Sequence, residues 1–297
     1  MANKRTRDRQ LAKLAARRQQ ERLAAKRRRD IALGVIGTVV AAVLIVGGWR
    51  LLTGDEADVA DPAVTPSANV AATGVPQVTG EVQRAVDPPE EVACGGDVPA
   101  TAEDPRPQYS HAPGVDLLDP EVRYRATVET SCGTIVLDLD ASRAPLAVSS
   151  FVFLSEEGFY DGLTVHRVAT DYVIQAGSSR GGGDGGPGYT FPDELTGRMR
   201  YEDGTLAMAN GGPNTNGSQW FIVSGPEGAN LDQMPNYTIF GRVVEGLDVV
   251  QTINDLPVVE GTDQPTQAIF IASVTIDERP ARDRQQPSAV PTENDAP

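Results

Sequence analysis

The stretch "MANGGPNTNGSQWFIV", residues 208–223, places a loop rich in turn-forming residues between two apolar runs. Every residue from Asn210 to Ser218 is Gly, Pro, Asn, Thr or Ser, types that favour turns through backbone freedom or local hydrogen bonds. "TLAMA" before the loop and "QWFIV" after it have the length and composition of strands. The pattern predicts a strand, a shaped loop, and a second strand that begins at Gln219.

The residues on either side continue as short strands with two helices. Helices are expected over 144–162, where Pro145 suits the first turn and Gly158 the end, and over 245–255. The other expected strands are "RYRATVET", "GTIVLDLD", "LTVHRV", "YVIQAG", "YTIFGRVV" and "IFIASVTIDE". Many strands with two helices predict a mainly β domain over 121–279, built as a closed barrel capped at its ends.

The charge of the chain divides sharply near its beginning. Residues 1–30 carry twelve Lys and Arg against three Asp and Glu, a net charge of +9. The whole chain has a net charge of −15, so the remaining residues carry −24. Residues 31–49 contain no charged side chain, and a helix of that length spans about 28 Å, close to the hydrocarbon core of a bilayer. We therefore expect a transmembrane helix over 31–52.

The basic segment predicts the orientation of this helix. Positive charge stays on the cytoplasmic side, so the acidic domain is expected outside the cell membrane. Two alternatives stay open: a cleaved signal peptide, with "ADVA" at 57–60 as the cleavage site, and binding of anionic lipid or nucleic acid by residues 1–30. For the acidic domain itself, no nucleic-acid partner is expected.

Two further regions lack a sustained hydrophobic period. Residues 53–120, rich in Ala, Pro, Val, Thr and Asp, predict an extended linker, and residues 280–297 predict a disordered tail. Cys94 and Cys132 both follow the apolar run. In an oxidising compartment such a pair is a disulfide candidate, with two free thiols as the alternative.

The sequence lacks the motifs that several classes of enzyme require. "GGGDGG" at 181–186 matches a dinucleotide fingerprint only weakly, because "PGYTFPDE" follows where a helix should begin. There is no Walker lysine and no G-x-S-x-G elbow. Two cysteines and two histidines do not favour a zinc site, and His166 within "TVHRV" favours a structural role. No metal is expected.

Three segments taken together, "TVHRVATDYVIQAG", "LAMANGGPNTNGSQWFIV" and "NLDQMPNYTIFGRV", resemble the cyclophilin family of peptidyl-prolyl isomerases. The resemblance covers residues 122–277, and the anchor and linker look like membrane-tethered bacterial members. It implies an eight-stranded antiparallel barrel with two capping helices, no cofactor, and proline-containing peptides and unfolded exported proteins as partners.

The resemblance also implies the site. Arg167 matches the family's catalytic arginine, and Gln175 orients it and bonds the substrate backbone. Phe221 is the third residue expected in the catalytic group. The remaining expected substrate-binding residues are Tyr172, Val173, Ala209, Asn210, Gln219, Leu231 and Tyr237. The expected apolar socket for the proline ring combines Phe221 with Tyr172, Val173 and Leu231, and Asn210 offers main-chain groups to an extended peptide.

The sequence departs from the family where Tyr172 and Val173 replace the commoner Phe and Met, and where Asn230 replaces Trp. Tyr237 stands for the family's His, across a two-residue insertion. The altered socket keeps a second function open, that of a non-catalytic peptide-binding or chaperone module. A third interpretation makes the domain a scaffold for a cytoplasmic function of residues 1–30.

Overall fold

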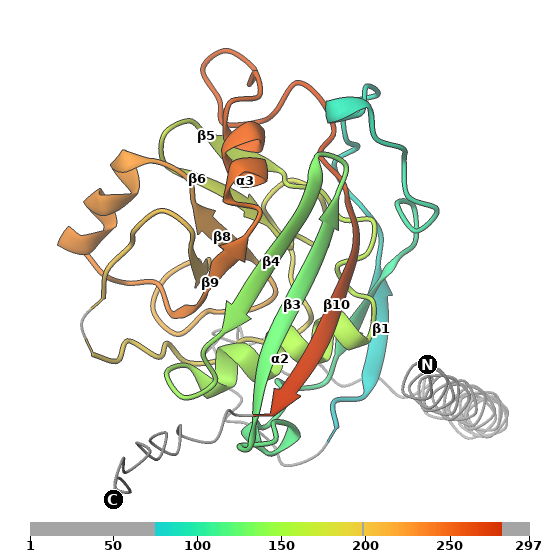
Figure 1. Cartoon of the computed structure of the whole chain (residues 1–297). Coiled ribbons are helices and arrows are strands. Elements are labelled where there is room, and N and C mark those ends of the chain that lie inside the picture. The colour runs from blue at the N-terminus through green and yellow to red at the C-terminus, as the bar shows by residue number, and fades with distance from the viewer. Residues whose placement is uncertain (1–74, 198, 281–297) are drawn as a thin grey trace, which may run out of the picture. The chain divides into compact units, whose positions relative to one another are not determined.

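The computed structural model describes residues 75–197 and 199–280, which form a curled antiparallel sheet with helices packed against it (Figure 1). Eight strands follow the spatial order β10-β3-β4-β9-β7-β8-β6-β5. Their bounds are β3 Val122–Thr130, β4 Gly133–Leu139, β5 Arg167–Ala169, β6 Val173–Ala176, β7 Thr205–Met208, β8 Trp220–Val223, β9 Ile239–Glu245 and β10 Ile271–Pro280. All of the ladders between them are antiparallel.

The sheet forms a half-barrel, whereas the sequence predicted a closed barrel. Its two outermost strands are β10 and β5, and an isolated bridge joins Thr164, which precedes β5, to Phe270, which precedes β10. The Val165 N–H also donates to the Ile269 carbonyl at 2.9 Å. Because β5 has only three residues, these irregular contacts take the place of a continuous ladder.

Two helices lie near the expected positions. α2 (Pro145–Glu156) begins with the predicted proline, and the N–H groups of Leu146 and Ala147 donate to the Glu194 carboxylate at 3.0 and 2.9 Å. Glu194 therefore satisfies donors that a first helical turn leaves unpaired. α3 (Leu247–Asn254) packs against β4, β5 and β6, and short 3-10 turns occupy η1 Ala93–Gly95, η2 Val115–Leu117 and η3 Pro226–Gln233.

The central strands bury apolar side chains on both faces, because alternate residues of a strand point to opposite sides. One face of β6, β7 and β8 contributes Ile174, Leu206, Trp220 and Ile222 to a core cluster that also holds Phe151 of α2. The opposite face contributes Val173, Ala207, Phe221 and Val223 to a second cluster, called here the socket cluster. The sheet therefore separates two apolar regions.

The leading segment, residues 75–120, is folded where the sequence predicted an extended linker. β1 (Val78–Val82) pairs antiparallel with β2 (Arg106–Tyr109). Ala93 and Tyr109 are 0% and 2% exposed. The segment lacks a periodic pattern because single small or aromatic side chains anchor it. Residues 53–74 of the expected linker lie outside the described residues.

A disulfide joins Cys94 of this segment to Cys132 in the β3–β4 turn, with a Cα–Cα distance of 5.0 Å. The sequence had identified this pair as the disulfide candidate. Beside the disulfide, the Ala93 N–H donates to the Ala268 carbonyl at 2.9 Å, and the Ala268 N–H donates to the Glu91 carbonyl at 2.7 Å. The leading segment is thus tied covalently and by main-chain bonds to the sheet domain.

None of the described helices is long and apolar enough to cross a membrane. The expected span over 31–52 and the basic segment over 1–30 lie outside the described residues, as does most of the expected tail. The strands of the half-barrel run from Val122 to Pro280, next to the expected bounds of 121–279.

Candidate active site

Three of the predicted residues lie in one row across neighbouring strands. Arg167 of β5 is paired with Gln175 of β6, and Gln175 is paired with Phe221 of β8. Directly opposed residues in antiparallel strands project their side chains to the same face. The register therefore brings a cation, an amide and an aromatic ring together on the face that carries the socket cluster.

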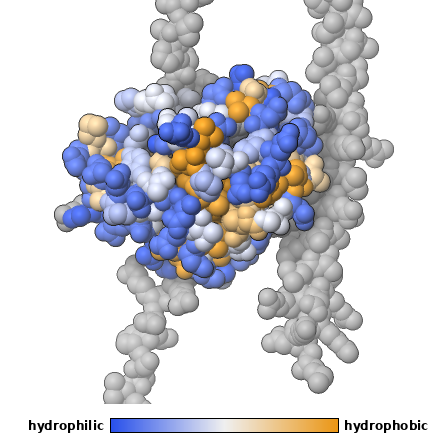
Figure 2. All heavy atoms as spheres, turned by 90° about the horizontal axis from the view of Figure 1, so that it is seen from above, coloured by the Kyte–Doolittle hydropathy of each residue, from blue (hydrophilic) through white to orange (hydrophobic). Residues whose placement is uncertain are grey.

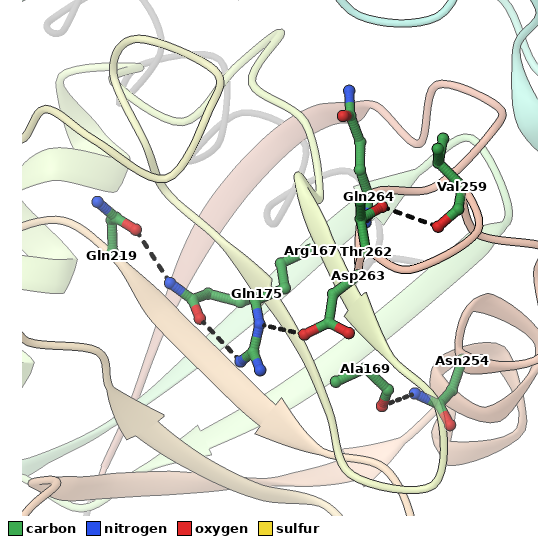
Figure 3. A network of polar contacts seen from close by, with 9 residues as sticks. All are labelled: Arg167, Ala169, Gln175, Gln219, Asn254, Val259, Thr262, Asp263 and Gln264. Carbon is green, nitrogen blue, oxygen red and sulfur yellow. Dashed lines mark hydrogen bonds and ion pairs between the residues drawn. The ribbon is translucent and has the colours of Figure 1, made fainter.

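A chain of side-chain hydrogen bonds, called here the polar row, runs from Arg167 through Gln175 to Gln219 (Figure 3). Arg167 Nη1 lies 3.5 Å from Gln175 Oε1, and Gln175 Nε2 donates to Gln219 Oε1 at 3.0 Å. Gln219 Nε2 then donates to the carbonyls of Gly183 and Gly185 at 2.8 and 3.1 Å. The structure thus connects Arg167 through two amides to the glycine-rich loop, with the weakest link at Arg167 itself.

The guanidinium of Arg167 has two other close neighbours. Its Nε donates to Asp263 Oδ2 at 2.9 Å, and its central carbon lies 5.9 Å from the centroid of the Tyr172 ring, within the range of a cation–π contact. Asp263 was not predicted from the sequence. It stands 96 positions further along the chain, in a turn-rich stretch that carries no motif pointing to it.

The socket cluster contains every apolar residue predicted for the proline ring. Val173, Phe221 and Leu231 are buried in it, at 2%, 4% and 8% exposed, and Tyr172 and Ala209 are half-buried at its edge. The other members were not predicted from the sequence; they are Ala169, Met199, Tyr201, Ala207, Val223 and Ile239. The one sequence feature that pointed to these residues was the alternation of apolar and polar side chains along the strands.

Tyr237 belongs to the same cluster and completes its rim. Its ring meets Phe221 edge to face, with centroids 5.3 Å apart and an interplanar angle of 88°. The Tyr201 hydroxyl donates to the Tyr237 carbonyl at 2.7 Å and accepts from the Tyr237 N–H at 3.2 Å. Burial raises the pKa of Tyr201 to about 12, so this hydroxyl stays protonated and can donate at neutral pH.

A large apolar side chain is exposed a few residues after Leu231 in the chain. Met234, between Leu231 and Tyr237 in the chain, is 71% exposed. Its N–H donates to the Leu231 carbonyl at 3.1 Å. Seen from above in Figure 2, the described part of the chain is hydrophilic over most of the side in view, with hydrophobic residues gathered near the middle. Apolar contact area is therefore available at the surface as well as in the socket.

The loop at 210–218 forms one wall of a cavity of about 560 Å³ next to the polar row. Gln175, Ala209, Asn210 and Gln219 line this cavity, together with the glycine-rich stretch 183–188. Asn210 Nδ2 donates to the Asn236 carbonyl at 2.9 Å, and the Ala209 N–H donates to the Gln219 carbonyl at 2.9 Å. The turn residues of the quoted stretch thus shape a groove wall, as the sequence indicated.

His166, the residue before Arg167, stays neutral at physiological pH. Burial lowers the pKa of its imidazole to about 4. The glycine-rich loop covers it, since a Cβ added at Gly183 would lie 3.4 Å from His166 Nε2. Arg167 is therefore the cation at this point of the row, with an uncharged neighbour on its N-terminal side.

The family model for cyclophilin-type peptidyl-prolyl cis-trans isomerases matches residues 125–276, about half of the chain. The chain belongs to the cyclophilin family. The matched residues hold the polar row, the socket cluster and both helices of the half-barrel. It is thus a cyclophilin-type peptidyl-prolyl cis-trans isomerase, and its mainly β fold is that of the family.

Two curated peptidyl-prolyl cis-trans isomerases match about half of the chain over nearly their whole length. Peptidyl-prolyl cis-trans isomerase-like 3 of Gallus gallus is 36% identical over 158 residues, which cover 52% of this chain and 96% of the relative. A peptidyl-prolyl cis-trans isomerase of Dictyostelium discoideum is 41% identical over 153 residues, 50% of this chain and 95% of the relative. A crystal structure of a cyclophilin from Cryptosporidium parvum is 31% identical, has a TM-score of 0.49, and covers 53% of this chain and 99% of the solved one.

Proposed function

We propose that this cyclophilin isomerises X–Pro bonds at the row formed by Arg167, Gln175 and Phe221. The carrying observation is the register that sets the Arg167 guanidinium beside a socket able to hold a proline ring. The rotation crosses a barrier of about 18–20 kcal/mol, because the amide has partial double-bond character. No covalent bond has to form or break, so the protein needs only to bind the twisted amide more tightly than either planar form.

Arg167 supplies the differential contact. Twisting the amide makes the prolyl nitrogen pyramidal and leaves a lone pair on it. A guanidinium N–H directed at that lone pair stabilises the twisted state more than the planar ones. Gln175, within 3.5 Å of Arg167 Nη1 and 3.0 Å of Gln219 Oε1, orients the guanidinium and offers its amide to the substrate backbone.

The socket holds the proline ring while the chain on its N-terminal side turns. Phe221, Val173 and Leu231 supply the buried apolar surface, and Tyr172 and Tyr237 close its edges. Ala209, Asn210 and Gln219 border the adjoining cavity, where main-chain groups bind the residues before proline. A proline-containing peptide in extended form is the ligand that fits both regions.

The deciding experiment compares wild type and Arg167→Ala by exchange NMR, with catalytic amounts of the full-length chain and an Ala-Pro peptide. We expect the isomerisation rate to fall about 10²–10³-fold, or roughly 3–4 kcal/mol in barrier height, with little change in peptide affinity. Arg167→Lys should rescue little, because an ammonium lacks the planar fork of donors. A rate for Arg167→Ala within about twofold of wild type would reject this role and favour a non-catalytic peptide-binding module.

We also propose that the domain acts on exported or envelope proteins, tethered outside the cell by residues 31–52. The charge of +9 before the apolar run supports this orientation. The Cys94–Cys132 disulfide supports an oxidising compartment. External protease added to wall-stripped cells should remove the domain, and peptides from exported, non-reduced protein should contain the disulfide. A protected domain or two free thiols would contradict the location.

A further inference from the structure

A carboxylate from a distant loop holds the proposed catalytic arginine. Asp263 lies between α3 and β10, and its Oδ2 accepts from Arg167 Nε at 2.9 Å. The two side chains are 36% and 47% exposed, so the pair sits at the surface where a substrate would arrive. This contact is shorter than the 3.5 Å contact between Arg167 and Gln175.

The loop fixes Asp263 through main-chain bonds that do not involve the Arg167 side chain. The Val259 N–H donates to the Gln264 carbonyl at 2.8 Å, and the Thr262 N–H donates to the Val259 carbonyl at 3.0 Å. The Val168 N–H also donates to the Asp263 carbonyl at 2.7 Å, which ties the loop to β5. Figure 3 shows the carboxylate directed at the guanidinium from this turn. The position of the Asp263 carboxylate therefore does not depend on the Arg167 side chain.

The two polar contacts engage different nitrogens of one rigid group. Asp263 accepts from Nε and Gln175 accepts from Nη1, and in the described part of the chain they leave Nη2 to donate to a ligand. Because the guanidinium is planar, two acceptors at separate nitrogens define its plane. Without Asp263, only the longer Gln175 contact and the ring of Tyr172 would orient it.

We propose that Asp263 is a positioning residue for the isomerisation, which acts by orienting Arg167. The inference rests on the catalytic role proposed for Arg167. A carboxylate has two opposed effects here: it fixes the direction of the fork, and it offsets part of the positive charge that stabilises the twisted amide. Exposed ion pairs interact weakly in water, whereas small errors in the placement of a catalytic group are costly. Orientation is therefore the larger effect.

The test compares Asp263→Ala with Asp263→Asn in the full-length chain. Asp263→Ala should lower kcat about three- to fivefold with an unchanged KM, because the fork loses one of its two acceptors. Asp263→Asn keeps an oxygen that can accept from Nε, and should restore kcat to within about twofold of wild type. If both variants are as fast as wild type or faster, or if only KM changes, the positioning role is wrong.

A matched control and a double variant complete the test. Asp277 forms a surface ion pair with Arg279 at 3.3 Å, with 69% of its side chain exposed, and Asp277→Asn makes the same change of net charge. It should leave kcat unchanged, whereas an equal fall would assign the effect to general charge and reject the proposal. Asp263→Ala should cost nothing further in Arg167→Ala, and an additional loss there would also reject it.

The outcomes separate the two proposals. If Arg167→Ala retains the wild-type rate, the catalytic role of Arg167 fails and the role of Asp263 fails with it. If Arg167→Ala loses the rate while both Asp263 variants behave as wild type, the catalytic role stands and only the positioning role fails.

Discussion

The two faces of the central strands have almost the same burial but different neighbours. On one face, Trp220 packs with Phe151 of α2, with ring centroids 6.2 Å apart, inside the core cluster. On the other, Phe221 packs with the half-buried Tyr237 in the socket cluster. The core face is covered by other parts of the protein, whereas the socket face ends at residues that a ligand can reach. Burial alone therefore does not distinguish a structural residue from a binding one.

The largest expected effect belongs to the core face. Phe151 is 1% exposed and contacts the rings of Tyr160, Trp220 and Phe240. Phe151→Ala should lower the free energy of unfolding by about 3–5 kcal/mol, because it removes buried apolar surface and leaves a cavity. Urea unfolding followed by tryptophan fluorescence measures the change. A decrease in the free energy of unfolding below about 1 kcal/mol would contradict the structural role assigned to the core face.

The second effect comes from the buried imidazole next to Arg167 in the chain. His166 has a folded pKa of about 4 against about 6.5 when unfolded, so the unfolded chain binds more protons between these pH values. Stability should therefore fall as pH drops from 6.5 to 4, by up to about 3 kcal/mol. Burial raises the pKa of Tyr160 and Tyr109 in the core, and neither hydroxyl titrates in that acidic window.

The measurement is the pH dependence of unfolding in wild type and in His166→Gln. Both proteins share the titration of their carboxylates, so the difference between the two curves isolates the histidine. The variant should lose less stability than wild type between pH 6.5 and 4. Parallel curves would show that His166 does not stay neutral in the folded protein.

The third effect tests the socket directly. Phe221→Ala should lower kcat/KM about 30-fold, which corresponds to a loss of about 2 kcal/mol of transition-state stabilisation. The reason is that the ring contacts the substrate in both planar and twisted states. Affinity and rate should fall together, unlike in Arg167→Ala. Its cost in stability should be less than half of that of Phe151→Ala, and equal costs would mean that both rings are ordinary core residues.

The smallest effect concerns Tyr172, where the family more often has phenylalanine. The ring face that lies 5.9 Å from the Arg167 guanidinium carbon is retained in Tyr172→Phe, so kcat/KM should change about twofold or less. Tyr172→Ala, which removes the ring, serves as the comparison and should lower it more. A large loss in Tyr172→Phe would assign a function to the hydroxyl.

The mainly β, eight-stranded fold was predicted from local patterns and from the resemblance to the cyclophilin family, although the sheet is a half-barrel and not a closed barrel. The strand alternation and the motif around Arg167, Gln175 and Phe221 were readable, and the structure brings these residues together. The role of Asp263 could not be predicted, because its partner Arg167 lies 96 positions away and its loop is rich in turn residues. The leading segment was misinterpreted for the same reason: contacts such as that of Arg84 Nη2 with the Gly162 carbonyl, at 3.1 Å, leave no period in the sequence.

The fold of the leading segment determines part of the cavity beside the polar row. Gln108 lines this cavity and donates to the Gly186 carbonyl at 2.8 Å, and the Tyr109 N–H donates to the Pro187 carbonyl at 2.7 Å. Both residues lie outside the stretch 125–276 that matches the family. One wall of the cavity is thus supplied by residues that the family model does not match, so a substitution at Gln108 can alter the cavity without changing Arg167, Gln175 or Phe221.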